Sequence, residues 1–215
     1  MKINILTIFP EFFKTPLETS ILKRAVAKEL VEFNLINLRD FTTDNHQTTD
    51  QRPFGGGPGM VMMIEPIDRA LQFLGVSKGQ KNKKIFLTSA KGSLFIQETA
   101  KSFSALDEIA IICGHYEGVD ERVALNLVDE EIRIGDYVLT GGEVAALVMS
   151  DAVTRLIPGV LGNEFSNLDE SHSEPGKMGH PQFTKPVDYK GWIVPEILLS
   201  GHHEKIKNWR DGKKS

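Results

Sequence analysis

Residues 131–143 read Glu-Ile-Arg-Ile-Gly-Asp-Tyr-Val-Leu-Thr-Gly-Gly-Glu and join an apolar, strand-like run to a glycine pair and then to an amphipathic helix. Residues 111–118, which read Ile-Ile-Cys-Gly-His-Tyr-Glu-Gly, repeat this pattern: a buried strand ends in glycine and the chain turns. Glycine lets the backbone adopt positive φ and approach a ligand without a Cβ in the way. We therefore expect the two strand ends to form one pocket, in which main-chain N–H and C=O groups contact a small molecule.

Strand and helix signals alternate along the chain. Apolar runs predict strands at 2–8, 31–38, 84–88 and 108–113, and apolar periodicity predicts helices at 20–30, 66–74, 96–103, 119–127 and 143–157. We expect Ser20 to cap the first of these helices and residues 89–92 to form a turn beside the pocket. The alternation is typical of an α/β fold with a mostly parallel sheet. Such sheets bind ligands beyond the carboxyl ends of their strands, where 87–90, 114–118 and 134–142 should converge.

Length and composition are those of an ordinary globular protein. The chain has 215 residues, of which 40% are hydrophobic and 25% charged, enough for one full core or a core with a small appendage. The single Cys113 excludes an internal disulfide and lacks the companions of a structural zinc site. A reducing compartment, the cytoplasm, is therefore expected. No apolar stretch approaches the length of a transmembrane helix, and Pro10 interrupts the N-terminal apolar run, so neither a membrane nor a signal peptide is expected.

Charge is distributed unevenly along the chain. The net charge is −4, but residues 176–215 contain eight Lys or Arg against four Asp or Glu, a local balance of +4 that leaves −8 for residues 1–175. This C-terminal part is either a phosphate-facing surface or a solvated helix face. Trp209 lies there among Lys205, Lys207 and Arg210 and could stack on a base, although a role in anchoring a small helical core is the stronger expectation.

Residues 40–60 form a long segment without apolar periodicity and include a Gly-Gly-Gly-Pro-Gly run at 55–59. Long loops inside compact domains are usually functional, although a flexible surface connection remains an alternative. The run is not a dinucleotide-binding fingerprint, because the last glycine position counted from Gly55 holds Met60. It is not a phosphate-binding P-loop either, because no Gly-Lys-Ser/Thr follows.

Three motifs together resemble the bacterial tRNA (guanine-N1)-methyltransferases, the TrmD family of knotted (SPOUT) methyltransferases. They are Cys-Gly-x-Tyr-Glu-Gly-Val-Asp-Glu-Arg at 113–122, Ile-Gly-Asp-Tyr-Val-Leu-Thr-Gly-Gly-Glu at 134–143 and Arg-Pro-Phe-Gly-Gly-Gly-Pro-Gly-Met at 52–60. The likeness runs from Ile8 to Arg210. It implies transfer of a methyl group from S-adenosylmethionine to N1 of guanine 37, the base 3′ of the tRNA anticodon. It also implies a deep trefoil knot and an obligate homodimer with shared active sites, and it gives no reason to expect DNA as a partner.

The resemblance further implies a division of the chain and a set of site residues. Residues 1–161 would form the knotted S-adenosylmethionine-binding domain, 162–181 a linker, and 182–215 a small helical tRNA-binding domain. The expected cofactor contacts are Leu87, Thr88, Ser89, Ala90, Gly114, Tyr116, Glu117, Gly118, Ile134, Gly135, Asp136, Tyr137, Val138, Leu139, Gly141 and Gly142. The expected substrate contacts are His46, Asp50, Arg52, Gly55, Gly56, Gly57, Lys205, Lys207 and Arg210.

Methylation of guanine N1 requires a proton acceptor and a group that stabilises charge on the base. A carboxylate can accept the N1 proton, and both Glu170 and Asp169 are candidates. The family has an aspartate immediately before a serine here, whereas this chain has Glu170 before Ser171. Arg155 is the candidate for stabilising charge on the guanine carbonyl oxygen, and its alternative is an ion pair with Asp151 on the same helix.

Two features differ from the family pattern, and a third concerns metal binding. His115 stands where the family usually has arginine, and the chain ends at Ser215, where the family continues for a few helical turns. A shortened C-terminal domain with weaker tRNA binding is therefore expected. The family links the position of Glu117 with magnesium, but one carboxylate does not make a metal site, so Mg²⁺ is considered possible and no metal ligand is assigned.

Two rival functions belong to other classes. A non-catalytic RNA-binding module would keep the fold without turnover, but the pocket glycines and linker carboxylates of an enzyme are present. A knotted methyltransferase that acts on another RNA is disfavoured by the 52–60 motif. A hydrolase is not expected, because His-Glu-x-x-His is absent and the one Gly-x-Ser-x-Gly match, at 75–79, lies in a polar connector that follows an expected helix, not at a strand-to-helix turn. On the 143–157 helix, Val144, Val148, Ala152 and Leu156 form an apolar stripe that predicts either a core face or a dimer interface.

Overall fold

The computed structural model describes residues 1–162, 170–174 and 176–213, and the chain divides into two compact units, Met1–Gly162 and Asn163–Ser215. The first unit contains a five-stranded sheet in the order β2-β1-β6-β5-β7, in which every neighbouring pair is parallel. Its strands are β1 (Lys2–Thr7), β2 (Glu32–Asn37), β5 (Lys83–Leu94), β6 (Glu108–Ile112) and β7 (Glu130–Arg133). The predicted α/β class with a mostly parallel sheet is confirmed.

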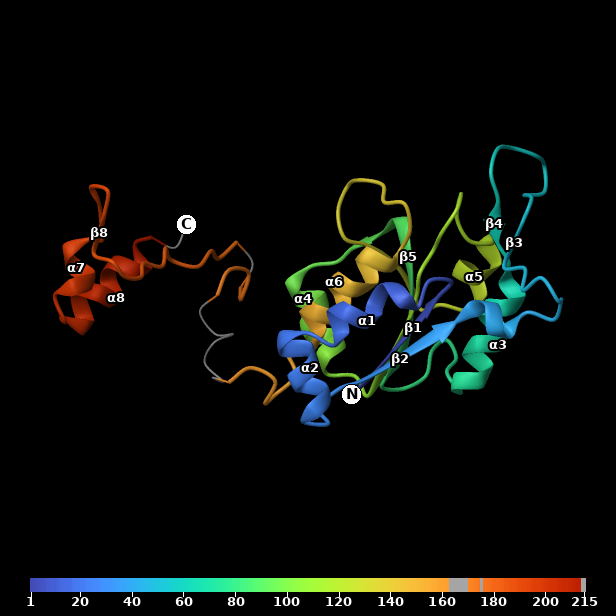
Figure 1. Ribbon diagram of the computed structural model, residues 1–215, viewed down its shortest axis with the longest axis horizontal. Helices are drawn as coiled ribbons and strands as arrows, with labels where there is room; N and C mark the ends of the chain where they lie inside the picture. The colour runs from blue at the N-terminus through green and yellow to red at the C-terminus, as the bar shows by residue number, and fades with distance from the viewer. Residues whose placement is uncertain (163–169, 175, 214–215) are drawn as a thin grey trace. The chain divides into compact units, whose positions relative to one another are not determined.

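Helices cover both faces of this sheet (Figure 1). One face carries α1 (Glu11–Leu17), α2 (Ser20–Ala27), α4 (Gln97–Ser104) and α6 (Glu143–Thr154), and the other carries α3 (Ile64–Leu74) and α5 (Glu121–Asn126) with the short 3₁₀ helix η1 (Leu38–Phe41). Neighbouring strand residues alternate between the two cores: Ile5 packs in the first and Leu6 in the second. Burial on both faces explains why the strands read as continuous apolar runs.

The long 40–60 segment is more structured than its sequence indicates. Its residues 50–51 form β3 (Asp50–Gln51), which pairs antiparallel with β4 (Val61–Met62). Phe54 is fully exposed in the intervening loop, and Gly55, Gly56 and Gly57 all have positive φ. The motif therefore forms the tip of an open hairpin loop between β3 and β4 that projects from the first unit (Figure 1).

The prediction of a turn at residues 89–92 is wrong. β5 continues through these residues to Leu94, and a bulge shifts its register against β7 between Thr88 and Ser93. A Cβ at Gly92 would collide with the backbone of Glu131 and Ile132, so only glycine allows this close approach. Ser89, Ala90 and Lys91 of this bulge line the pocket that was expected here.

Two helix predictions also need correction. Ser20 is the first residue of α2 rather than its cap; Thr19 holds the cap position and makes no capping hydrogen bond. On α6 the apolar stripe is divided: Ala152 and Leu156 pack against the core, whereas Val144 and Val148 are more than 40% exposed. The core is also contacted by Ala146, Met149 and Val153. α6 is apolar on nearly all sides, so periodicity alone could not select its buried face.

The second unit contains a hairpin of β8 (Asp188–Tyr189) and β9 (Trp192–Ile193), followed by α7 (Glu196–Leu199) and α8 (His203–Asp211). Both helices lie within residues 182–215, where a small helical domain was expected, whereas the hairpin was not expected. The linker expected at 162–181 falls partly outside the described residues. Within the described part of the chain, no helix has the length and apolar character needed to cross a membrane.

Candidate active site

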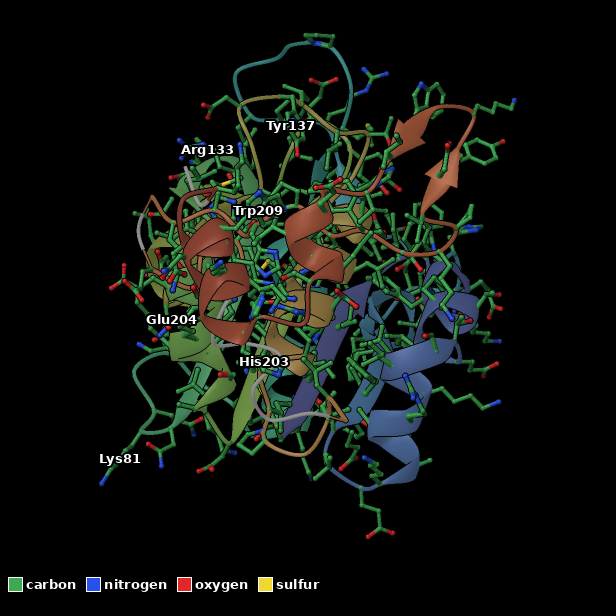
Figure 2. The ribbon with its side chains drawn as sticks, turned by 90° about the vertical axis from the view of Figure 1, so that its left-hand side faces the viewer. Lys81, Arg133, Tyr137, His203, Glu204 and Trp209 are labelled. Atoms are coloured by element: carbon green, nitrogen blue, oxygen red, sulfur yellow. The ribbon has the colours of Figure 1, made fainter. Side chains whose placement is uncertain are left out.

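A cavity of about 460 Å³ opens at the carboxyl ends of β5, β6 and β7. Its volume lies within the range of small-molecule sites, about 300–1,000 Å³. Two of the side chains labelled in Figure 2 lie at opposite ends of the first unit: Tyr137 lines this cavity, and Lys81, before β5, lies at the other end. The cavity therefore lies at the edge of the sheet where the strands have their carboxyl ends, as expected for a parallel α/β sheet.

The floor of the cavity depends on a set of close backbone approaches. The Thr88 hydroxyl donates to the Ile112 carbonyl oxygen (3.1 Å) and accepts from the Gly114 N–H (3.0 Å), which ties the ends of β5 and β6 together. The Gly142 N–H donates to the Gly114 carbonyl oxygen at 2.7 Å. A Cβ at Gly142 would collide with Thr88 and with the Gly114 nitrogen. Residue 142 must therefore be glycine for the floor to close.

A buried carboxylate supports this floor from below. Glu143, 5% exposed, accepts a hydrogen bond from the Thr7 hydroxyl (2.9 Å), and its other oxygen lies 3.6 Å from Nδ1 of His115. A Cβ at Gly141 would collide with both side chains, so they pack directly against the glycine turn. His115 therefore supports the turn and does not line the cavity.

The thiol of Cys113 belongs to the same buried region. Its complete burial, with the nearby Glu143 carboxylate as a second cause, raises its pKa well above the ordinary value. The thiol therefore stays protonated at neutral pH, and Cys113 acts as a packing residue rather than a nucleophile.

Ionic contacts form the rim. Arg133 bonds the Asp136 carboxylate at 2.8 Å and also donates to the Gly92 carbonyl oxygen, which connects the β5 bulge to the loop after β7. Lys91 contacts Glu121 at 2.6 Å and Glu131 at 3.8 Å. The Glu121 hydrogen bond raises the pKa of Lys91 from its ordinary value. These contacts hold the two rim segments in place.

Most of the predicted cofactor contacts line the cavity; Tyr116 and Asp136 do not. Asp136 is held outside by its ion pair with Arg133. The lining also includes residues that sequence reasoning missed: Lys91, Val119, Glu121, Ala124, Glu131, Ile132, Arg133 and Ala145. Lys91 comes from the β5 bulge, residues 131–133 from β7, and the other four from the segment 119–124 and the first turn of α6.

The predicted substrate loop lies beside the cavity loop after β6. The Glu117 N–H donates to the Met60 carbonyl oxygen (3.0 Å), the Met62 N–H donates to Gly118 (2.9 Å), and Gly59 lies against the Glu117 side chain. Tyr116 has a positive φ of 61° and faces the hairpin side. Burial first, and then the Asp50 carboxylate, raises the pKa of Tyr116. Asp50 and the glycine hairpin are thus joined to the segment that lines the cavity.

His46 lies in a turn held by a carboxylate. The Asp44 carboxylate accepts from the backbone N–H of His46 at 3.2 Å and from the hydroxyl of Thr48 at 2.7 Å. The Thr48 hydroxyl bond lowers the pKa of Asp44. Asp44 therefore orders the segment that presents His46, while Arg52 is exposed where the glycine hairpin begins.

Arg155, one of the catalytic candidates, does not line the cavity. α6 begins at the cavity, where Ala145 lines it, and ends next to Arg155. At about 1.5 Å of rise per residue, Arg155 lies roughly 15 Å along the helix from that cavity. Glu170 is half-buried in the second unit, and Asp169 lies outside the described residues. Lys205, Lys207 and Arg210 are exposed on α8.

No metal site is evident in the described part of the chain, where no three His, Cys, Asp or Glu side chains are grouped as ligands would be. Glu117 contacts Gly59 rather than a second carboxylate. The residues that the structure describes therefore do not fit a resident magnesium ion.

Comparison with known proteins agrees with this geometry. A family model described as tRNA (Guanine-1)-methyltransferase TrmD matches residues 1–215. The chain belongs to this family. Relatives named tRNA (guanine-N(1)-)-methyltransferase include one from Ruminiclostridium cellulolyticum, 50% identical over 98% of this chain and 89% of its own length. Another, from Carboxydothermus hydrogenoformans, is 51% identical over 98% of this chain and 81% of its own length. A third, from Christiangramia forsetii, is 50% identical over 99% of this chain and 93% of its own length.

Proposed function

We propose that this protein transfers a methyl group from S-adenosylmethionine to N1 of guanine 37 in tRNA. Membership of the family makes the chain a tRNA (guanine-N1)-methyltransferase; the methyl donor, the position in the tRNA and the residue roles are our additions. The observation that carries the proposal is the glycine-lined cavity at the ends of β5, β6 and β7. Because Gly114, Gly141 and Gly142 place no side chain in the cavity floor, the cavity has room for an adenosine.

The donor supplies an electrophilic methyl group when bound, and the protein supplies position and proton transfer. Thr88 and Glu143 hold the floor rigid, which orients the ligand without a further ordering cost. The Gly55–Gly57 hairpin tip, connected to Glu117, would hold the guanine side of the reaction. We assign N1 proton removal to Glu170, with Asp169 as the alternative, and charge stabilisation on the guanine oxygen to Arg155.

The knot and the cytoplasmic location remain part of this proposal. β7 is an edge strand of the sheet and pairs with β5. The chain after β7 nevertheless passes back across the end of β5, and its Gly142 N–H donates to the carbonyl oxygen of Gly114, which follows β6. This return supports the trefoil threading that the family resemblance implies. The first unit would bind the donor, and the second would bind tRNA.

The test of the function is methyl transfer from labelled S-adenosylmethionine to tRNA transcripts that differ only at the base 3′ of the anticodon. We expect label at N1 of guanine in the transcript with G37 and none when that base is adenine. Binding without label would favour the RNA-binding module, and label in another RNA would favour a different knotted methyltransferase.

We further propose that the active site is shared between two copies of the chain. The cavity and Arg155 lie at opposite ends of α6, and the exposed Val144 and Val148 supply an apolar face for a second copy. Arg155→Ala and Gly142→Val should each be inactive alone. After exchange of subunits, about a quarter of wild-type activity should return, because half the dimers then pair one damaged copy of each kind and keep one intact site. No recovery, with heterodimers verified by tag pull-down, would assign all site residues to one chain.

The exposed cations of α8 should bind tRNA through phosphates. Neutralising Lys205 and Lys207 together should reduce the slope of log affinity against log salt by about 0.7–0.9 for each lost contact. Titration of tRNA between low and moderate salt measures this slope. Lys81→Gln, at the far end of the first unit, is the matched control and should leave the slope unchanged (Figure 2). An unchanged slope in the double variant would remove α8 from the RNA surface.

A further inference from the structure

The β8–β9 hairpin exposes large apolar side chains to solvent. Trp192 is 74% exposed, Ile193 63% and Tyr189 52%. Tryptophan is highly buried on average in folded proteins, and clustered exposed apolar side chains mark interaction sites. The tip of this hairpin therefore has the properties of a binding surface.

The two aromatic rings are fixed before any partner arrives. Tyr189 and Trp192 are cross-strand partners, with ring centroids 5.9 Å apart. Lys190 and Gly191 form the two-residue turn between them, and both have positive φ, as a tight hairpin turn requires. The Gly191 N–H donates to the Asp188 carboxylate at 2.8 Å, which stabilises the turn. A preorganised pair of rings loses little conformational entropy when it binds.

Charge indicates what kind of partner fits. The Lys190 ammonium lies 5.3 Å from the centre of the Tyr189 ring, so a cation accompanies the aromatic surface. The one carboxylate of the hairpin, Asp188, is occupied by the turn. Residues 176–215 as a whole carry eight Lys or Arg against four Asp or Glu. Aromatic rings with nearby cations bind unpaired nucleotides, because bases stack on the rings while the cation contacts a phosphate.

We propose that Tyr189, Lys190 and Trp192 form a stacking platform for unpaired nucleotides of the tRNA substrate. The proposal rests on the proposed function and adds a contact separate from the cations of α8. Paired stems would not fit the platform, because their bases are already stacked on each other. The platform accordingly binds loop or end nucleotides, with Trp192 as its largest contact surface.

The affinity of the full-length protein for a tRNA transcript tests this platform. Trp192→Ala should weaken binding about tenfold, in the range measured for loss of one stacked base, while Trp192→Phe should stay within about threefold of wild type. The salt slope should be unchanged in Trp192→Ala and reduced by about 0.7–0.9 in Lys190→Gln, because only the lysine contacts a phosphate. Leu199→Ala, which also removes an exposed apolar side chain from the second unit, is the matched control and should bind as wild type.

A spectroscopic measurement reports the contact directly. The chain has two tryptophans, so Trp209→Phe leaves Trp192 as the single emitter. Addition of tRNA or a short single-stranded RNA should quench its fluorescence, and a fully paired duplex should not. Wild-type affinity in Trp192→Ala, or absence of quenching, would overturn the platform even if the wild type methylates tRNA. A changed oligomeric state of Trp192→Ala with unaltered tRNA affinity would assign the hairpin to a protein contact and also overturn it. Failure of the wild type to methylate any tRNA would instead reject the proposed function.

Discussion

Gly142→Val should weaken S-adenosylmethionine binding by about 100-fold while the protein remains folded. A side chain at this position would collide with Thr88 and the Gly114 nitrogen, the groups that close the cavity floor. Overpacking of a filled site costs about 1–3 kcal/mol, and the chain can relieve it by moving the Gly141–Gly142 turn away from Gly114. That movement removes the cavity floor. Each 1.4 kcal/mol lost from the binding free energy lowers the affinity about tenfold.

Calorimetric titration of the donor into the purified variant measures this effect, with thermal unfolding followed by circular dichroism as the test of folding. Gly162→Ala is the matched control, because a Cβ there meets no atom within 4 Å and the residue does not have positive φ. The control should bind the donor as wild type does. Unchanged donor affinity in folded Gly142→Val would show that this cavity is not the donor site.

The sequence predicted the parts of the site that depend on local chemistry. Apolar runs predicted the strands, and the rule for parallel sheets placed their carboxyl ends at one edge, where the cavity lies. Gly114, Gly141 and Gly142 line this cavity, as predicted, because only a residue without a Cβ allows neighbouring segments to approach its backbone so closely. The order of strands in the sheet was not predicted from the sequence, because the pairing of β5 with β7 is a contact between distant segments.

The remaining features arise from contacts between segments far apart in the chain. Nothing around Gly92 indicates a bulge, because its cause is the backbone of β7 on the neighbouring strand. The pairing of His115 with Glu143, and of both with Gly141, requires the loop after β6 to meet the start of α6. The exposed Val144 and Val148 were ambiguous because both sides of α6 are apolar. Tertiary packing decided these points, and local periodicity carries no information on it.

Glu170→Gln should reduce the rate of methyl transfer by about 10²-fold to 10⁴-fold, the usual loss when a general base is removed. Glutamine keeps the size of the side chain but cannot accept the N1 proton. Glutamate ionises in nearly the same pH range as the aspartate of the family pattern, so the chemistry is kept. Donor affinity should be nearly unchanged, because the cavity is built from residues 87–145 of the first unit.

Single-turnover rates at saturating tRNA measure the chemical step separately from binding. Glu174→Gln is the matched control: this carboxylate belongs to the same segment and pairs with Lys177 at 3.2 Å, so its loss should leave the rate unchanged. Glu170→Asp should retain much of the activity, since it preserves the carboxylate, and Asp169→Asn should be mild. The reverse order, with Asp169→Asn slow and Glu170→Gln fast, would transfer the role of base to Asp169. Near-wild-type rates in both variants would exclude Glu170 and Asp169 as the proton acceptor, because loss of a general base slows the proton-transfer step.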